Sequence, residues 1–98
     1  MGQINWTKEA ERWVTDIYDY IAQDNPSAAK EVVNGIYSRT QILLTFPQAG
    51  HRYSEEQEGN IRILLYGHYR IAYFLKTNDN IDILGVFHGA MEIDRYLS

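Results

Sequence analysis

The stretch "IRILLYGHYRIAYFLKTNDNIDILGVFH" (61–88) decides the fold of this chain. Three runs rich in Ile, Leu, Tyr and Phe lie within it: 61–66, 69–76 and 81–88. Their apolar residues recur with a period of two, which is typical of β-strands. Gly67 and His68 form a two-residue turn between the first two runs, and "TNDN" (77–80) forms the second turn. The stretch therefore predicts three consecutive antiparallel strands, a β-meander.

The two turns also set the expected pairing of the strands. A two-residue loop in the second turn places Lys76 opposite Ile81 and Phe74 opposite Ile83. One face then carries Ile61, Ile63, Leu65, Arg70, Ala72, Phe74, Ile83 and Phe87. The other carries Arg62, Leu64, Tyr66, Tyr69, Ile71, Tyr73, Leu84, Val86 and His88. Both faces are largely apolar, so we expect helices to cover one face and the C-terminal segment or a partner protein to cover the other.

A short strand and two helices are predicted before the meander. "QINW" (3–6) has strand character, and Thr7 suits a helix N-cap. Apolar residues then recur at helical spacing over about 16 residues, at Ala10, Trp13, Val14, Ile17 and Ile21. Asn25 and Pro26 fit the start of a second helix, which is expected to end near "FPQAG" (46–50). The pair should form an antiparallel helix hairpin.

Three further features complete the predicted architecture. Gly35 inside the second helix is unfavourable, and close packing on the first helix is a reason to keep it. "HRYSEEQEGN" (51–60) is polar and indicates a surface loop, whereas 90–97 indicates a short last helix or a tail. The fold class is therefore α+β: an N-terminal strand, an antiparallel helix hairpin, a three-stranded antiparallel meander and a short C-terminal helix or tail.

Composition predicts one domain, residues 1–98. Hydrophobic residues make up 45 % of the chain and aromatic residues 13 %, as in globular proteins. The absence of cysteine excludes disulfides and thiolate metal sites. No signal-peptide pattern opens the chain and no apolar run reaches the ~20 residues that span a bilayer, so we expect a cytoplasmic protein without membrane contact. A net charge of −4 without a basic stripe disfavours direct nucleic-acid binding.

The order of these elements carries motifs of a known superfamily. The motifs are "INWTKEAERWVTDIYDYIAQDNPSAAKEVV" (4–33), Pro47-x-x-Gly50 followed by Arg52, "YRIAY" (69–73) and "IDILGVFHGA" (81–90). Together they resemble the RelE/ParE superfamily of bacterial toxin–antitoxin toxins, and the ParE-like branch fits best. The resemblance implies a plasmid-stabilisation type of toxin that a cognate antitoxin protein neutralises. ParE-like members poison DNA gyrase, whereas RelE-like members cleave mRNA in the ribosomal A site.

The two activities make different chemical demands. RNA cleavage without a metal needs groups that move protons and stabilise the phosphorane charge, which RelE-like enzymes supply with lysines, arginines and a C-terminal tyrosine. This chain has Ile61 and Ile63 where those lysines stand, although Arg70 matches the family arginine. The next family arginine falls at Ala90 or Met91 and is absent.

The tail also departs from the ParE-like pattern. Many ParE-like sequences have His-Gly-x-Arg-Asp here, whereas "HGAMEI" (88–93) has Met91 and Glu92 in the last two places. An acidic side chain is kept and the arginine is lost, so a weakened or retargeted toxin is an alternative.

The candidate site residues follow from this comparison. The candidates for catalysis are Arg70, His88 and Tyr96. The candidates for contact with the target or the antitoxin are Arg62, Tyr66, Tyr69, Arg70, Tyr73, His88 and Met91. The histidines lack an H-x-x-x-H or HExxH spacing, so no metal site and no cofactor are predicted.

Several candidates also have a purely structural interpretation. His88 fits a strand-end residue that hydrogen-bonds the backbone beside Gly89. Arg70 fits an ion pair with Asp82 or with an acid of the first helix, and Arg62 fits a solvated strand residue. The three tyrosines 66, 69 and 73 share a predicted face, so they form a partner-binding strip or pack beneath the tail. The "SEEQE" run (54–58) fits a solvated loop that repels RNA.

The hypothesis from the sequence is a ParE-like toxin that acts by protein–protein inhibition, with DNA gyrase as the expected target and a cognate antitoxin as partner. One alternative is a RelE-like ribosome-dependent mRNA endonuclease. Another is a non-toxic relative that only binds the antitoxin.

Overall fold

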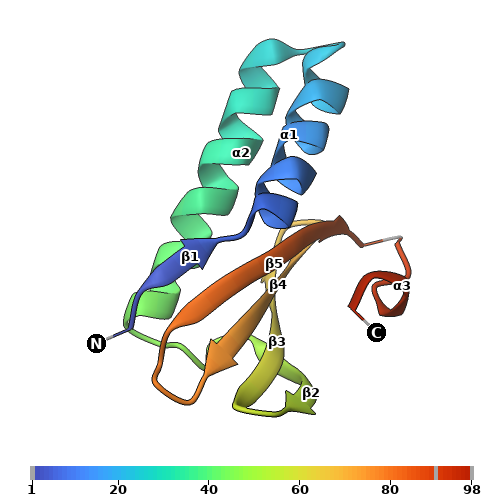
Figure 1. Ribbon diagram of the computed structural model, residues 1–98. Coiled ribbons are helices and arrows are strands. Elements are labelled where there is room, and N and C mark those ends of the chain that lie inside the picture. The colour runs from blue at the N-terminus through green and yellow to red at the C-terminus, as the bar shows by residue number, and fades with distance from the viewer. Residues whose placement is uncertain (1, 90, 98) are drawn as a thin grey trace.

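A computed structural model describes residues 2–89 and 91–97 of the chain. A short strand, β1 (Ile4–Trp6), precedes two helices, α1 (Lys8–Ala22) and α2 (Pro26–Thr40). A 3-10 turn, η1 (Gln41–Leu44), follows α2. The remaining elements are β2 (His51–Glu56), β3 (Gly59–Tyr66), β4 (Tyr69–Lys76), β5 (Ile81–His88) and α3 (Asp94–Leu97). The α+β fold class and the order of elements predicted from the sequence are confirmed (Figure 1).

The strands of the described residues form one five-stranded sheet in the order β1-β5-β4-β3-β2. β1 pairs with β5 in parallel, whereas the other neighbours are antiparallel. Tyr66 lies opposite Tyr69, so Gly67 and His68 form the predicted two-residue turn. Gly67 has a φ of 56°, a left-handed conformation that glycine adopts without strain. The predicted meander is therefore confirmed, and the first strand joins it at the edge formed by β5.

The predicted register of β4 against β5 is confirmed for Tyr69–Ala72, which pair with residues 85–88, but it was wrong for the half of the pair next to the turn. Leu75, not Lys76, lies opposite Ile81, and Phe74 lies opposite Asp82. The turn is longer than two residues, because the Lys76 N–H donates to the carbonyl of Asn80 at 2.9 Å. A shift between Ala72 and Tyr73 adds one residue to β5, so Ile83 packs on the helix side of the sheet and Leu84 on the other side.

The predicted surface loop at 51–60 was also wrong, because residues 51–56 form the edge strand β2. Arg52 lies opposite Arg62 and Ser54 opposite Ile61, with a shift of register between Arg52 and Ser54. Most side chains of β2 are exposed, as its polar sequence indicated. Backbone hydrogen bonds to β3 form the strand without requiring an apolar sequence.

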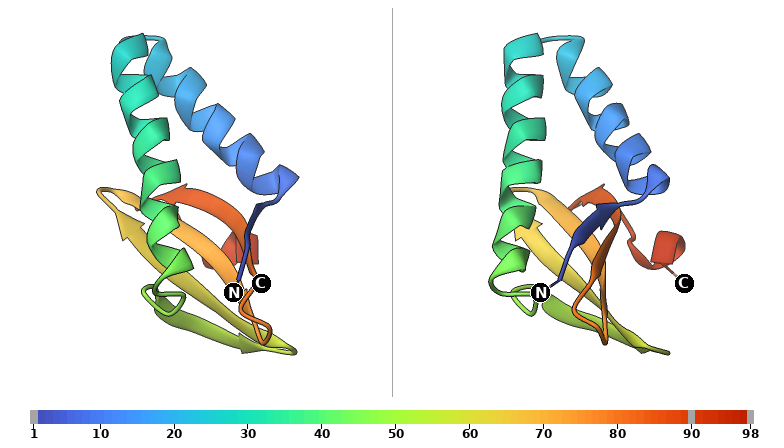
Figure 2. Two further views of the ribbon diagram at one scale, coloured as in Figure 1. Left: turned by 90° about the vertical axis from the view of Figure 1, so that its left-hand side faces the viewer. Right: turned by 60° about the vertical axis from the view of Figure 1, so that its left-hand side comes forward.

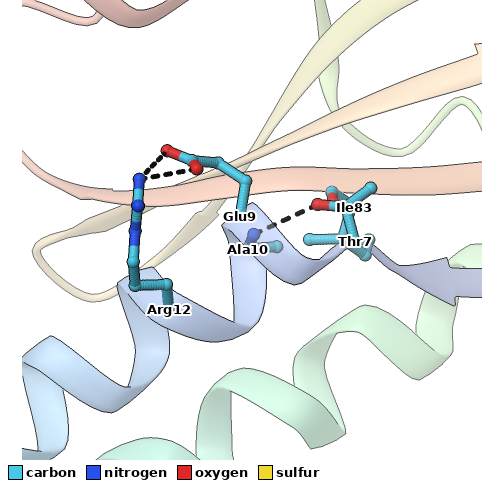
Figure 3. A network of polar contacts seen from close by, with 5 residues as sticks. All are labelled: Thr7, Glu9, Ala10, Arg12 and Ile83. Atoms are coloured by element: carbon cyan, nitrogen blue, oxygen red, sulfur yellow. Dashed lines mark hydrogen bonds and ion pairs between the residues drawn. The ribbon is translucent and has the colours of Figure 1, made fainter.

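Local capping explains where both helices begin. The Thr7 hydroxyl oxygen accepts the Ala10 N–H at 3.1 Å and donates its proton to the carbonyl of Ile83 at 2.7 Å (Figure 3). Thr7 therefore starts α1 and fixes it to β5. Asn25 accepts the Ala28 N–H at 3.1 Å and Pro26 opens α2, as predicted. The regular helix ends at Thr40, earlier than expected, and η1 continues the chain toward 46–50.

The two faces of the sheet carry separate apolar clusters, and Figure 2 shows α1 and α2 on one side of the sheet and α3 on the other. The helix-side cluster includes Val14, Ile36, Ile71 and Ile83. The opposite cluster consists of Ile63, Ala72, Phe87 and Ile93, with partly buried neighbours such as Leu97. The prediction that the helix hairpin covers one face is confirmed, and of the two covers expected for the other face, the C-terminal segment packs on it through Ile93 and Leu97.

Gly35 is closely packed, but the predicted partner was wrong. A methyl group built on Gly35 would overlap the phenol ring of Tyr66 in β3, not a side chain of α1. Tyr66 thus lies beneath α2 and depends on this glycine.

None of the helices among residues 2–89 and 91–97 is long and apolar enough to cross a membrane.

Candidate functional site

An open groove of about 430 Å³ lies between α1 and the end of the sheet where β4 begins and β5 ends. We call it the α1 groove. Its lining residues are Trp13, Asp16, Ile17, Tyr20, Ile21, Tyr69, Val86, His88 and Met91. Most of these side chains are apolar or aromatic, as in sites that bind a partner segment or a ligand.

One side of α1 forms a wall of the α1 groove. Ile17, Tyr20 and Ile21 follow Trp13 by four, seven and eight residues, so they lie on one side of the helix. Tyr20 is 77 % exposed. A large exposed aromatic beside an apolar groove is typical of a contact surface.

The end of the sheet supplies the second part of the groove. Tyr69 and His88 are cross-strand partners, and their rings meet edge to face with centroids 5.8 Å apart. Burial raises the pKa of Tyr69 above its usual value. His68 also lies near His88, with ring centroids 6.4 Å apart. His88 itself is exposed at the end of β5.

Arg70 fixes the start of the C-terminal segment. Its Nη2 donates to the carbonyl of Met91 at 2.6 Å and to that of Gly89 at 3.3 Å. Its Nε is buried and has no hydrogen-bond partner among the described residues. The predicted ion pair of Arg70 with Asp82 or with an acid of the first helix was wrong: among the described residues Arg70 has no ion pair, and Asp82 pairs with Lys76 at 3.0 Å. The guanidinium is thus held by backbone carbonyls of the tail.

Arg62 and Tyr73 lie elsewhere and hold the loop before β2. The prediction that Arg62 is solvated was wrong, because it is 8 % exposed and donates to the carbonyl of Gly50 at 2.6 Å. Tyr73 is fully buried; its hydroxyl donates to the carbonyl of Pro47 at 2.7 Å and accepts the Gly50 N–H at 3.0 Å. Burial raises the pKa of Tyr73, and the bond to Gly50 and the charge of Arg62 oppose that rise.

The other candidates occupy three different places. Tyr66 is half-buried beneath α2. Tyr96 lies on the opposite side of the sheet, where its ring stacks on Phe87 at 5.3 Å and meets Trp13 edge to face at 5.1 Å. Met91 lines the α1 groove. Ala90, the alternative position for the family arginine, lies outside the described residues.

The structure therefore brings Tyr69, His88 and Met91 together and separates them from Arg62 and Tyr73. The predicted strip of three tyrosines is divided, because only Tyr69 reaches the α1 groove. Sequence reasoning missed Asp16 and Tyr20 of α1, whose helical spacing from Trp13 was the available signal. Among the described residues, no group of three or more His, Cys, Asp or Glu side chains is arranged to hold a metal ion.

Solved structures of other proteins share this fold, and two of them are described here. One, described as a chromosomal ParDE toxin–antitoxin system from P. aeruginosa, matches with a TM-score of 0.72 and 25 % identity, over 90 % of this chain and 96 % of that chain. The other, the toxin–antitoxin complex RelBE2 from Mycobacterium tuberculosis, matches with a TM-score of 0.51 and 23 % identity, over 89 % and 96 % of the two chains. No curated protein matches this sequence.

A family model covers almost the whole domain. The model of the ParE toxin of the type II toxin–antitoxin system parDE matches residues 4–93, which span every strand and both long helices of the described chain. The resemblance seen in the sequence is thereby confirmed, and this chain belongs to the ParE toxin family of type II toxin–antitoxin systems.

Proposed function

We propose that this ParE-family toxin acts in the bacterial cytoplasm by binding and inhibiting a protein, with DNA gyrase as its target. We further propose that a cognate antitoxin neutralises it by occupying the α1 groove. The observation that carries the proposal is the groove itself, an open apolar surface with Tyr20 77 % exposed at its side. Both solved structures described above are named as toxin–antitoxin assemblies, which supports a partner of this kind.

The placement of the cationic side chains supports inhibition by contact over RNA cleavage. Nη1 of Arg62 and Nη2 of Arg70 donate to backbone carbonyls of the chain itself. Ile61 and Ile63, at the positions of the RelE-like lysines, are 8 % and 2 % exposed. Tyr96 packs on the rings of Trp13 in α1 and Phe87 in β5. A phosphorane intermediate needs several donors that converge on one point, and these residues point to separate places.

The test separates the three functions that the sequence left open. Induced expression should arrest growth, and co-expression of the adjacent gene product, the expected antitoxin, should relieve the arrest. Purified toxin should inhibit supercoiling by gyrase and leave ribosome-bound mRNA intact. Cleavage of mRNA in the A site that Arg70→Ala abolishes would instead establish the endonuclease. Absence of growth arrest would favour the non-toxic relative that only binds the antitoxin.

A further inference from the structure

We propose that Asp16 makes the α1 groove selective for an antitoxin segment that carries a lysine or arginine beside its apolar side chains. This inference rests on the proposed binding of an antitoxin in that groove and names the chemistry of the segment. It assigns to Asp16 the role of a specificity-determining residue.

Asp16 is the only acidic side chain that lines the α1 groove, among the residues that the structure describes. The remaining lining residues are Tyr69, His88 and apolar or aromatic groups of α1, β5 and the tail. The groove thus combines a large apolar surface with one carboxylate at its edge. An apolar segment alone matches the surface but leaves the carboxylate without a complement.

The carboxylate of Asp16 has no ion pair within the described part of the chain. Arg12, one turn before Asp16 on α1, pairs instead with Glu9 at 2.6 Å (Figure 3). Asp16 therefore places a carboxylate without an ion-pair partner, among the described residues, at the side of the groove.

Filling the groove changes the energetics of this charge. In the free toxin, water solvates the exposed carboxylate of Asp16. A bound apolar segment removes part of that water, and a carboxylate that loses water without gaining a partner is unfavourable. A cationic side chain on the segment offsets the loss, whereas an acidic one adds repulsion. The net charge of −4 of the chain favours approach of the same cationic segment.

The matched variants are Asp16→Lys and Asp24→Lys. Both residues are exposed acids of the helix hairpin, but Asp24 lies in the turn after α1 and does not line the groove. The probe is the purified product of the adjacent gene, titrated onto intact toxin. We expect Asp16→Lys to raise the dissociation constant about tenfold, and Asp24→Lys to change it by less than about twofold.

A charge-reversal series identifies the partner residue. Each lysine or arginine of the antitoxin's toxin-binding region is replaced by glutamate in turn. One of these antitoxin variants should bind the Asp16→Lys toxin about as tightly as wild-type antitoxin binds wild-type toxin. The same variant should bind the wild-type toxin more weakly than wild-type antitoxin does. Wild-type toxin should bind the antitoxin about threefold more tightly than Asp16→Asn does. This difference in affinity should shrink in high salt, because ions screen a partly exposed ion pair.

The possible failures are distinguishable. If wild-type toxin does not bind the adjacent gene product, the proposed antitoxin function is wrong. If it binds, and Met91→Glu or Ile17→Glu weakens binding while Asp16→Lys does not, the groove is occupied but the selectivity is wrong. If Asp16→Lys and Asp24→Lys weaken binding of the antitoxin equally, the effect comes from the overall charge of the toxin, and the inference is wrong.

Discussion

Gly35 and Tyr66 form a pair in which one residue lacks a side chain to make room for the other. We expect Gly35→Ala to destabilise the fold by about 1–3 kcal/mol, because the added methyl group overlaps the ring of Tyr66. This outweighs the gain of about 1 kcal/mol that alanine brings to a helix interior. Urea denaturation of the purified variant measures the change.

In the control background, the change in stability expected from Gly35→Ala has the opposite sign. In a Tyr66→Leu background the phenol ring is gone, so Gly35→Ala should stabilise the fold by about 0.5–1 kcal/mol through helix propensity alone. The difference between the two backgrounds is the coupling energy of the pair. A stabilising Gly35→Ala in the wild-type background would show that Tyr66 does not occupy this space.

At the same scale, sequence reasoning failed for Arg62 and Tyr73 for a physical reason. Alternation along the strand placed both residues correctly on the face that carries Leu64 and Ile71. It did not reveal their burial, because their hydrogen-bond partners belong to a loop; Gly50, for example, is 12 residues from Arg62 in sequence. The sequence alone does not distinguish a buried arginine in a strand from a solvated one, because the carbonyl groups that it contacts lie elsewhere in the chain.

The C-terminal segment is the element that covers the second face of the sheet. Ile93 is 7 % exposed in the cluster with Phe87, and Tyr96 stacks on that same ring. The Tyr53 hydroxyl also donates to the carboxylate of Asp94. Removing residues 92–98 should therefore lower the free energy of unfolding by about 3 kcal/mol and expose Phe87 to apolar dyes.

Urea denaturation and dye fluorescence measure these effects. The matched control is Arg95→Ala in the full chain. The side chain of Arg95 is 75 % exposed and pairs only with Glu92 in the described structure, so its loss should change stability by less than about 0.5 kcal/mol. A truncated chain as stable as wild type would show that the segment does not contribute to the fold.

At the scale of elements, the helices were easier to predict than the sheet. The caps at Thr7 and Asn25 are local in sequence, so both helix starts were located correctly. β2 was not predicted as a strand, because an edge strand with exposed side chains is held by backbone pairing and can have the polar composition of a loop. The alternation of apolar residues also gave no sign of the added residue in β5. That residue exchanges the predicted faces of Ile83 and Leu84.

At the scale of the whole molecule, the candidate site combines α1, the start of β4, the end of β5 and the tail. The sequence pointed to Tyr69, His88 and Met91 because they lie in or beside the family motifs. It did not point to Asp16 and Tyr20. Which side of α1 stays uncovered depends on how the hairpin lies across the sheet, and helical periodicity alone does not determine that arrangement.

Burial of tyrosines in several elements gives the molecule a dependence on alkaline pH. Burial raises the pKa of Tyr37 in α2, and the nearby charge of Glu11 adds to the rise. Burial also raises the pKa of Tyr69 and Tyr73 in β4 above the usual value of 10.0. The folded state therefore holds these protons more tightly than the unfolded chain does.

The sign of the pH dependence follows from that difference. The stability from these tyrosines is fully present below about pH 10 and is lost as pH rises through their higher folded-state pKa values. Tyr73→Phe should be less stable than wild type at neutral pH, because the Gly50 N–H loses its acceptor. Its disadvantage should shrink above about pH 10, since phenylalanine has no proton to lose. Urea denaturation of both proteins across that range measures the difference, and a constant gap would contradict the assignment.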